Sequence, residues 1–263
     1  MGLPMEKPQN ERYTYADLLS WDTDIRYELY DGVPVALASP SPEHQRIVRH
    51  LLVGLEDYIQ KNGCGGEVFP APLDVRIFEG TSDRPEDVII TVQPDLMVVC
   101  DRDKLDEKGV RGAPDFIIEV LSPTTERNDR YTKFSYYQRA GVREYWIVDP
   151  SAKHVQTFLL EEGRYIAQVY SGEQKVSSGI FEGLEIDLEP VFCRINPAVG
   201  TDSPTGGNQM DNVKFSYQDL LDIFGQDAKL ELYDGVIYVG DKTFDEIVET
   251  YLRIKADKQN RTE

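Results

Sequence analysis

The sequence is poor in cysteine, in basic residues and in long apolar runs, and each shortage argues against a class of protein. Its three cysteines, Cys64, Cys100 and Cys193, lie far apart and form no CxxC pair, which argues against a disulfide framework and a structural zinc site. No apolar run approaches the roughly 20 residues that cross a bilayer, and the first residues lack the apolar core of a secretory signal. We therefore expect no membrane span and a location in a reducing cytoplasm.

Basic side chains are scarce relative to acidic ones. The 263 residues include 28 Lys and Arg against 47 Asp and Glu, which gives a formal net charge of −19. Such a field repels a polyanion. A protein of this composition that acts on nucleic acid therefore needs a local basic groove, a metal ion that neutralises phosphate, or both. The excess of acid can equally serve solubility alone.

A partial internal repeat is the strongest positive signal in the sequence. Tyr13–Leu19 (YTYADLL) returns as Phe215–Leu221 (FSYQDLL), and Glu28–Val33 (ELYDGV) returns unchanged as Glu231–Val236. The two offsets differ by one residue (215 − 13 = 202 and 231 − 28 = 203). We interpret this pattern as a duplication that stops early.

The repeat divides the chain into three parts. Residues 12–195 form the main domain, residues 196–210 are rich in Pro, Gly, Ser and Asn and are typical of a flexible linker, and residues 211–263 are the truncated copy. A fragment of this length, expected as helix, hairpin and helix, buries too little surface to be stable alone. We expect it to dock on the main domain or on a partner subunit; the third possibility is a remnant without function.

Helix signals in the main domain are clear at three places. A short helix is expected over Tyr15–Trp21, and the apolar residues of 43–60 fall on one helical stripe. A further helix should begin between Thr124 and Asp129 and end at Gly141, a residue suited to a helix C-terminus.

Strand signals surround these helices. Asp31-Gly32 favours the type I′ turn of a hairpin, and Leu73–Ile77 alternates as a half-buried strand does. Leu96–Cys100 and Phe116–Leu121 are continuously apolar, typical of central strands covered on both faces. We therefore predict an α/β fold in which helices flank one mixed sheet.

Two carboxylates interrupt these apolar strands. Asp95 stands directly before Leu96, and Glu119 lies inside Phe116–Leu121. Burying an ionised carboxylate without a partner costs several kcal/mol, so each acid needs a cation, donors or a raised pKa. Mg²⁺ prefers one or two carboxylates and keeps several waters, so a shared magnesium site is one solution. An arginine partner for each acid is the structural alternative.

Lys133 lies on the helix expected after Glu119, with Arg130 one turn before it and Tyr137 one turn after it. Residues with this spacing share a helix face. A lysine beside a metal-bound water can orient the water and stabilise charge that develops on phosphorus. A solvated helix face is the alternative interpretation.

Several of these motifs together resemble the Uma-two family of bacterial restriction-endonuclease-like proteins, within the PD-(D/E)XK superfamily. The resemblance spans roughly residues 13–192 and is carried by Gln93–Leu96 (QPDL), Ile118–Pro123 (IEVLSP), Lys133 and Ala140–Pro150 (AGVREYWIVDP). It implies a restriction-endonuclease-like sheet core and cleavage of phosphodiesters with a divalent metal.

The resemblance also implies roles for individual residues. Asp95 and Glu119 correspond to metal ligands. The superfamily places a lysine two residues after the glutamate, where this chain has Leu121, so Lys133 supplies the amine from the next helix instead. Glu28 corresponds to an early acid that adds a ligand or holds a water, unless it only packs the hairpin. His44 corresponds to a contact with phosphate or with the metal shell, unless it is structural.

These signals predict a Mg²⁺-dependent or Mn²⁺-dependent endonuclease acting on DNA, as a homodimer if it cuts both strands. The catalytic residues are then Asp95, Glu119, Lys133 and Glu28, and the substrate contacts are His44, Arg130 and Tyr137. The alternative is a catalytically inactive nuclease-fold module that binds nucleic acid or protein. Hydrolysis of RNA is a third interpretation of the same site.

Overall fold

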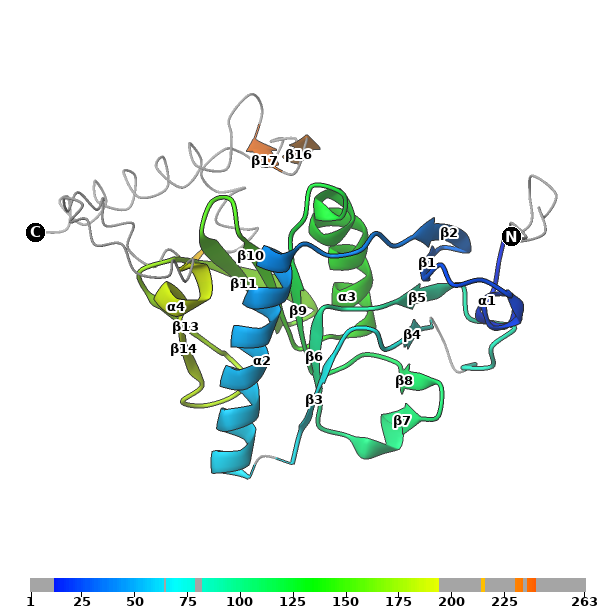
Figure 1. Ribbon diagram of the computed structural model, residues 1–263, viewed down its shortest axis with the longest axis horizontal. Helices are drawn as coiled ribbons and strands as arrows, with labels where there is room; N and C mark the ends of the chain where they lie inside the picture. Colours follow the sequence, from blue (N-terminus) through cyan, green and yellow to red (C-terminus); the bar gives the residue numbers. More distant parts are fainter. Residues whose placement is uncertain are drawn as a thin grey trace, which may run out of the picture.

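The protein is described by a computed structural model that covers residues 12–63, 65–78 and 82–193 and the backbone of three short segments nearer the C-terminus. Its strands form two larger sheets and two small ones (Figure 1). The predicted linker, residues 196–210, lies outside the described residues, and so does most of the predicted appendage.

The larger sheet has seven strands, of which only β9 and β10 run parallel. In spatial order they are β15 (Lys214–Phe215), β12 (Arg164–Ser171), β11 (His154–Glu161), β10 (Glu144–Asp149), β9 (Phe116–Val120), β6 (Leu96–Val99) and β3 (Glu67–Pro70). The two continuously apolar runs form β6 and β9, which have a neighbouring strand on each side, and every residue of both strands is buried. The prediction of central strands is confirmed.

A second sheet of six short strands stands beside the first, on the right in Figure 1. In spatial order the strands are β2 (Val33–Ala36), β1 (Tyr27–Tyr30), β5 (Ile90–Val92), β4 (Val75–Ile77), β8 (Gly109–Arg111) and β7 (Leu105–Asp106), with β4 and β8 parallel. The expectation of one mixed sheet is therefore corrected to two. Strands of two to four residues carry too few alternations to be recognised from sequence.

Burial on β4 also differs from the expected half-buried strand. All three of its residues are buried, and they include Arg76 at 3% exposure. The guanidinium of Arg76 lies 2.6 Å from Oδ1 of Asp106, so an ion pair accompanies its burial. The alternating pattern predicted an exposed Arg76. This prediction was wrong because Asp106 of β7 supplies a partner that allows the arginine to be buried.

Helices cover the larger sheet on both faces. The long helix α2 (Pro42–Asn62) begins at the Ser41 cap and ends at Gly63, whose φ of 60° lies in the left-handed region. Helix α3 (Phe134–Ala140) continues from η2, a π-helical stretch over Asn128–Lys133, and ends at Gly141. The remaining elements are α1 (Tyr15–Ser20), η1 (Arg102–Lys104), α4 (Leu188–Phe192) and the strand pair β13 (Lys175–Ser177) and β14 (Glu185–Asp187).

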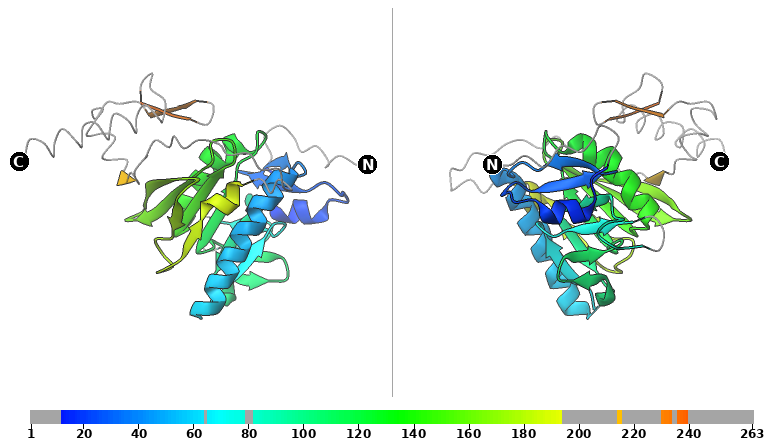
Figure 2. Two further views of the ribbon diagram at one scale, coloured as in Figure 1. Left: turned by 60° about the vertical axis from the view of Figure 1, so that its left-hand side comes forward. Right: turned by 90° about the vertical axis from the view of Figure 1, so that its right-hand side faces the viewer.

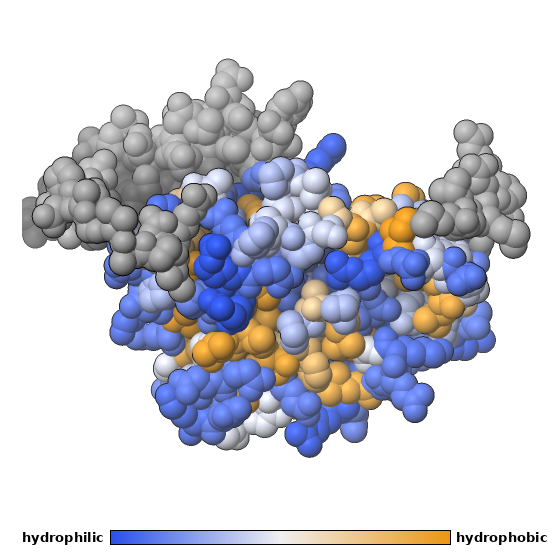
Figure 3. Space-filling view, in the orientation of Figure 1, coloured by the Kyte–Doolittle hydropathy of each residue, from blue (hydrophilic) through white to orange (hydrophobic). Residues whose placement is uncertain are grey.

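Alternate residues of β9 enter two separate cores. Phe116 and Ile118 pack with α2, whereas Ile117 packs with α3 and with strands of the second sheet. Figure 2 shows α2 lying along the sheet from two further directions. The face drawn in Figure 3 is a mosaic of hydrophilic and apolar patches. None of the helices in the described ranges combines the length and the hydropathy needed to cross a bilayer.

Candidate functional site

Asp95 and Glu119 lie side by side on one face of the seven-stranded sheet. Leu96 pairs with Ile118 in the antiparallel ladder of β6 and β9, so Asp95, one residue before β6, is next to Glu119. The backbone N–H of Asp95 donates to Oε2 of Glu119 across 3.3 Å. Because side chains alternate along a strand, both carboxylates point away from the α2 core.

The Asp95 carboxylate is held by the start of α2 and by the end of β9. Its Oδ2 lies 3.0 Å from Nε2 of His44 and accepts the backbone N–H of Val120 across 2.8 Å. Burial lowers the pKa of His44, but the hydrogen bond and the charge of Asp95 outweigh burial, and the pKa lies above its ordinary value. Both of these hydrogen bonds end on Oδ2. The bonds described for the Asp95 carboxylate therefore leave Oδ1 available to a cation.

Glu119 is buried, and one of its carboxylate oxygens accepts hydrogen bonds from two side chains. Its Oε1 accepts from Nζ of Lys133 across 3.0 Å and from the hydroxyl of Tyr137 across 2.8 Å. Burial raises the pKa of Glu119 well above its ordinary value, and Lys133 opposes this shift. The neighbouring charges of Asp129 and Asp95 raise the pKa further.

Lys133 joins three carboxylates. Its Nζ lies 3.0 Å from Oε1 of Glu28, 3.0 Å from Oε1 of Glu119 and 3.3 Å from Oδ1 of Asp129. Burial lowers the pKa of Lys133, but the three acids raise it well above its ordinary value. The lysine is therefore a charged ammonium, at 4% exposure.

Glu28 brings the second sheet into this cluster. It lies on β1 at 1% exposure, and its Oε1 accepts the backbone N–H of Gln93 across 2.7 Å. Its Oε2 accepts the hydroxyl of Tyr30. The early acid thus contacts the lysine directly and orients it.

Asp129 belongs to the cluster although the sequence analysis did not single it out. It is 1% exposed, and burial raises its pKa to about 6, against the opposing charge of Lys133. Its Oδ1 is buried without a hydrogen-bond partner in the described structure, although Nζ of Lys133 is 3.3 Å away. The sequence signal that could have identified Asp129 is its position four residues before Lys133, the spacing at which side chains of a helix meet.

The π-helical stretch determines which side chains reach the acids. The hydroxyl of Tyr145 donates to the backbone carbonyl of Asp129 across 3.0 Å within this stretch. A π-turn is wider than an α-turn, so the expected common face of Arg130, Lys133 and Tyr137 does not form. Lys133 and Tyr137 contact Glu119, whereas Arg130 does not.

Arg130 instead forms hydrogen bonds and ion pairs with residues beside the site. Its Nε donates to Glu126 across 3.0 Å, Nη1 to Gln156 across 2.8 Å and Nη2 to Asp149 across 3.0 Å. The side chain is 11% exposed. These three bonds give Arg130 an internal role in this structure, and its contact with substrate stays a prediction. Tyr137 is fully buried and likewise faces the acids rather than solvent.

A cavity of about 700 Å³ opens in front of the carboxylates. Its wall includes Glu28, His44, Asp95, Glu119, Asp129 and Lys133, together with hydroxyl side chains and one arginine from the surrounding loops: Arg26, Ser39, Ser41, Ser122, Thr124, Thr125 and Ser151. Neither Arg130 nor Tyr137 is among the described lining residues.

The donor set suits a hard divalent cation. Four carboxylates face one lysine and one histidine, and burial disfavours their combined negative charge, as the raised pKa values of Glu119 and Asp129 indicate. Among the described residues no group of three or more His, Cys, Asp or Glu side chains is arranged to hold a metal ion. An ion bound by two carboxylates and several waters, as Mg²⁺ prefers, does not need such a group.

Comparisons with known proteins agree with this fold. The sequence model of the Uma2 family, described as "Putative restriction endonuclease", matches residues 14–189. The crystal structure of a "putative nuclease belonging to DUF820" from Anabaena variabilis ATCC 29413 matches with a TM-score of 0.54 at 19% identity, over 68% of this chain and 97% of that chain. At this identity the likeness concerns the fold alone. A search of curated proteins found no match.

Proposed function

The chain belongs to the Uma2 family of restriction-endonuclease-like proteins, and we propose that it is a divalent-metal-dependent endonuclease that hydrolyses DNA phosphodiesters. One observation supports this most. Asp95, one residue before β6, stands next to Glu119 of the adjacent strand β9, and Nζ of Lys133 lies 3.0 Å from Glu119 at the edge of an open cavity.

Asp95 and Glu119 are the residues that would hold Mg²⁺ or Mn²⁺. When bound, such an ion neutralises phosphate charge and lowers the pKa of a coordinated water. Glu28 and Asp129 position Lys133, and the Lys133 ammonium stabilises negative charge on the phosphoryl oxygens during the reaction.

The reaction adds water across a P–O bond. The water oxygen bonds to phosphorus and loses a proton to solvent, the bond from phosphorus to the departing oxygen breaks, and that oxygen takes a proton. His44 lines the cavity, and its Nε2 lies 3.0 Å from Oδ2 of Asp95, so in this proposal it orients that carboxylate. Cutting both strands of a duplex favours a homodimer. A location in a reducing cytoplasm belongs to the same proposal, because Cys64, Cys100 and Cys193 lie far apart in the sequence and form no CxxC pair.

Nicking of supercoiled plasmid DNA tests the proposal. With Mg²⁺ or Mn²⁺ the wild-type chain should nick the plasmid, and chelation, Asp95→Asn or Glu119→Gln should abolish nicking. Asp115→Asn is the matched control, because Asp115 also stands directly before a buried strand, at the opposite end of β9, and accepts the N–H of Cys100. Equal nicking by all four chains would refute the assignment. Cleavage of RNA but not of DNA would change only the substrate.

A non-catalytic nuclease-fold binding module remains the second candidate. The observation that favours it is that Lys133 already contacts three of the carboxylates, and the net charge of −19 opposes DNA. Thermal unfolding in the presence of Mn²⁺ separates the two functions. A ligand at 100 times its Kd stabilises a folded protein by about 2.7 kcal/mol. The endonuclease should show such stabilisation in the wild-type chain and lose it in Asp95→Asn, whereas the binding module should show none in either chain.

A further inference from the structure

The two acids proposed to hold the metal ion are recessed in the cavity. The side chain of Asp95 is 20% exposed, whereas those of Glu119 and Lys133 are only 3% and 4% exposed. The cavity volume of about 700 Å³ lies within the usual range for a small-molecule pocket, roughly 300–1,000 Å³. A phosphate that reaches both acids must therefore enter this cavity rather than rest on an open surface.

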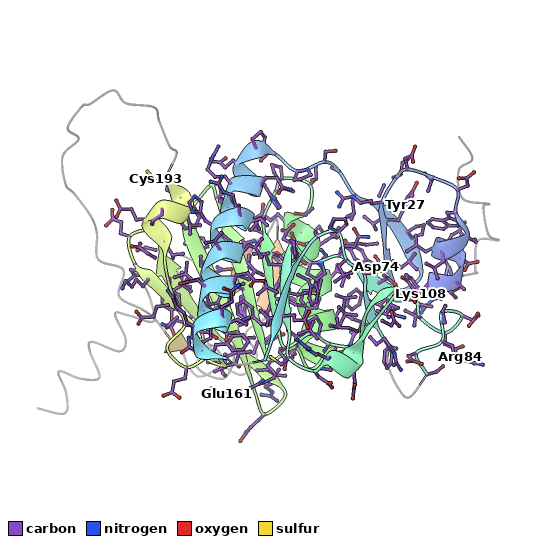
Figure 4. The ribbon with its side chains drawn as sticks, turned by 60° about the horizontal axis from the view of Figure 1, so that its bottom comes forward. Tyr27, Asp74, Arg84, Lys108, Glu161 and Cys193 are labelled. Carbon is purple, nitrogen blue, oxygen red and sulfur yellow. The ribbon has the colours of Figure 1, made fainter. Side chains whose placement is uncertain are left out.

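Connections between strands and helices form the rim of the cavity. Residues 37–41 link β2 to α2, residues 71–72 follow β3, residues 121–126 follow β9 and residues 150–151 follow β10, and all of them line the cavity. Figure 4, in which Tyr27 is labelled, shows the chain running from the first hairpin to the start of α2. Any polymer that binds here meets these connections before it meets the acids.

This rim disfavours an intact duplex. Duplex DNA is stiff, with a persistence length of about 150 base pairs, and its phosphates lie on a convex outer surface. To bring one phosphate into the recess, the duplex must bend or a nucleotide must leave the stack, and both changes cost free energy. A single strand enters the cavity without this cost.

The charge of the cavity also favours one strand over two. The described lining includes these carboxylates: Glu28, Glu43, Asp95, Glu119, Glu126, Asp129 and Asp149. Its basic side chains are Arg26, His44 and Lys133. Lys133 already contacts three acids, and His44 contacts Asp95. Because a duplex carries one negative charge per roughly 1.7 Å of its axis, twice the density of one strand, a lining with so few available cations suits the single strand better.

Arg26 is the basic lining residue whose guanidinium has no carboxylate partner within the described part of the chain. The N–H of Leu37 donates to the Arg26 carbonyl across 2.9 Å, which continues the ladder of β1 and β2 by one pair. Arg26 therefore has strand geometry, and its side chain lies on the same face as that of Glu28, about 7 Å along the strand. Because Glu28 contacts Nζ of Lys133, Arg26 is placed to bind the phosphate next to the scissile one.

The remaining lining contacts a backbone rather than bases. No Phe, Tyr or Trp is among the lining residues that the structure describes, and proteins that bind single strands through their bases stack them on such rings. Hydroxyl side chains, among them Ser39, Ser41, Thr124 and Ser151, line the cavity instead. Hydroxyls commonly donate to phosphate oxygens. The cavity therefore distinguishes the form of the DNA strand rather than its base sequence.

We propose that this cavity takes a single DNA strand, either free or as an unpaired stretch within a duplex, and that Arg26 binds the phosphate next to the scissile one. The inference rests on the proposed endonuclease, which defines the scissile phosphate. It agrees with the expected nicking of supercoiled plasmid, because negative supercoiling favours local unpairing.

Binding of labelled oligonucleotides tests the strand preference without cleavage. The full chain, with Ca²⁺ in place of Mg²⁺, is titrated into a fluorescent DNA strand and into the same strand annealed to its complement. Fluorescence anisotropy should show the single strand bound at least about tenfold more tightly, which corresponds to about 1.4 kcal/mol. Equal or tighter binding of the duplex, or no binding of either DNA, would overturn the proposal.

Arg26→Gln tests the contact with the neighbouring phosphate. It should weaken binding of the single strand about tenfold, as the loss of a charge-assisted hydrogen bond does, and lower the salt dependence by one phosphate contact. Arg26→Lys keeps the positive charge and should retain most of the affinity. Arg102→Gln is the matched control, because Arg102 is exposed and follows β6 at the end opposite Asp95. Equal affinities of Arg26→Gln and Arg102→Gln would overturn the assignment of Arg26.

Cleavage of a duplex with a central unpaired stretch, with Mg²⁺ present, separates this inference from the nuclease proposal. Cuts should fall within the unpaired stretch. Cuts spread equally over paired and unpaired DNA would overturn the strand preference and leave the endonuclease intact. Tighter binding of the single strand without any cleavage would refute the endonuclease and support the strand preference of the cavity.

Discussion

At the scale of single residues, the site depends on one buried ammonium among acids. Lys133 lies within 3.3 Å of carboxylate oxygens from Glu28, Glu119 and Asp129, which come from a hairpin, a central strand and its own helix. Removing one member of a buried ion pair costs about 3–5 kcal/mol because the other charge remains buried. The same contacts that orient the lysine therefore also hold the two sheets together.

Asp129 should make the stability of the chain depend on pH. Its pKa of about 6 in the folded chain exceeds the ordinary value of 3.8, because it is buried. Between these two pKa values the folded chain keeps a proton on Asp129 that the unfolded chain has lost. The resulting contribution to the free energy of unfolding is complete below the unfolded pKa of 3.8 and is lost as pH rises through the folded pKa of about 6. Asp129→Asn should therefore lose less free energy of unfolding than the wild-type chain between about pH 4 and pH 7.

Urea unfolding with a chelator present measures this difference. The exposed Asp22→Asn is the control and should follow the wild-type profile. Parallel profiles for the wild-type chain and Asp129→Asn would contradict a raised pKa for Asp129.

Arg130 should act on stability rather than on DNA binding. Arg130→Gln leaves Glu126 and Asp149 without their guanidinium partner and should lower the free energy of unfolding by about 1–3 kcal/mol. The salt dependence of DNA affinity should stay unchanged, because each phosphate contact contributes about −0.9 to its logarithmic slope. Arg26→Gln is the comparison, since Arg26 lines the cavity and its loss should reduce the slope by that amount. A reduced slope in Arg130→Gln would instead make Arg130 a phosphate ligand.

At the scale of elements, the π-helical stretch before α3 determines the direction of the Lys133 side chain. It lets Lys133 contact both Asp129 and Glu119 while Arg130 turns to Asp149. The wider turn is supported from β10, where the Tyr145 hydroxyl donates to the Asp129 carbonyl. Helical stretches of this kind occur often at functional sites.

Tyr145→Phe tests whether this element positions the lysine. The change leaves a buried carbonyl without its donor and should cost about 1–3 kcal/mol of stability. Tyr165→Phe is matched, because its hydroxyl makes the same kind of buried bond, to the carbonyl of Val142. Both variants should lose similar stability in urea unfolding, but only Tyr145→Phe should slow metal-dependent nicking. Equal nicking rates in the two variants would show that the π-helical stretch does not affect catalysis.

At the scale of the whole molecule, the main domain continues into the repeat through one edge strand. Strand β15 adds to β12, so the edge of the larger sheet is covered by residues that follow the linker. An uncovered edge strand presents unpaired backbone donors and acceptors. The start of the repeat thus contributes a strand to the main sheet.

Ending the chain at residue 210 should lower its melting temperature. The deletion removes β15 from β12 together with every contact of the repeat. For a domain of this size each kcal/mol corresponds to about 2–4 °C, and we expect a decrease of at least about 2 °C in a thermal unfolding scan. An unchanged melting temperature would show that the repeat adds nothing to the folded main domain.

Local sequence was sufficient for the elements near the site. The apolar runs at Leu96 and Phe116 formed central strands, and Asp31-Gly32 formed the hairpin turn, with φ of 49° and 79°. Each follows from a preference that acts within a few residues, either burial of a continuous apolar run or tolerance of positive φ. The acids that interrupt those strands were visible for the same reason.

Contacts between distant residues were decided only by the tertiary structure. The second sheet, the contact of His44 with Asp95 across 51 residues and the inclusion of Asp129 all depend on which surfaces pack together. The direction of Arg130 depends on a helical turn whose width follows from Tyr145 and the buried acids rather than from local spacing. Sequence alone determined the period and burial of the longer elements, such as α2, β6 and β9, because those follow from local preferences. The grouping of charges required the fold, because the attraction within a buried ion pair offsets the cost of removing both charges from water only where the fold brings the partners together in good geometry.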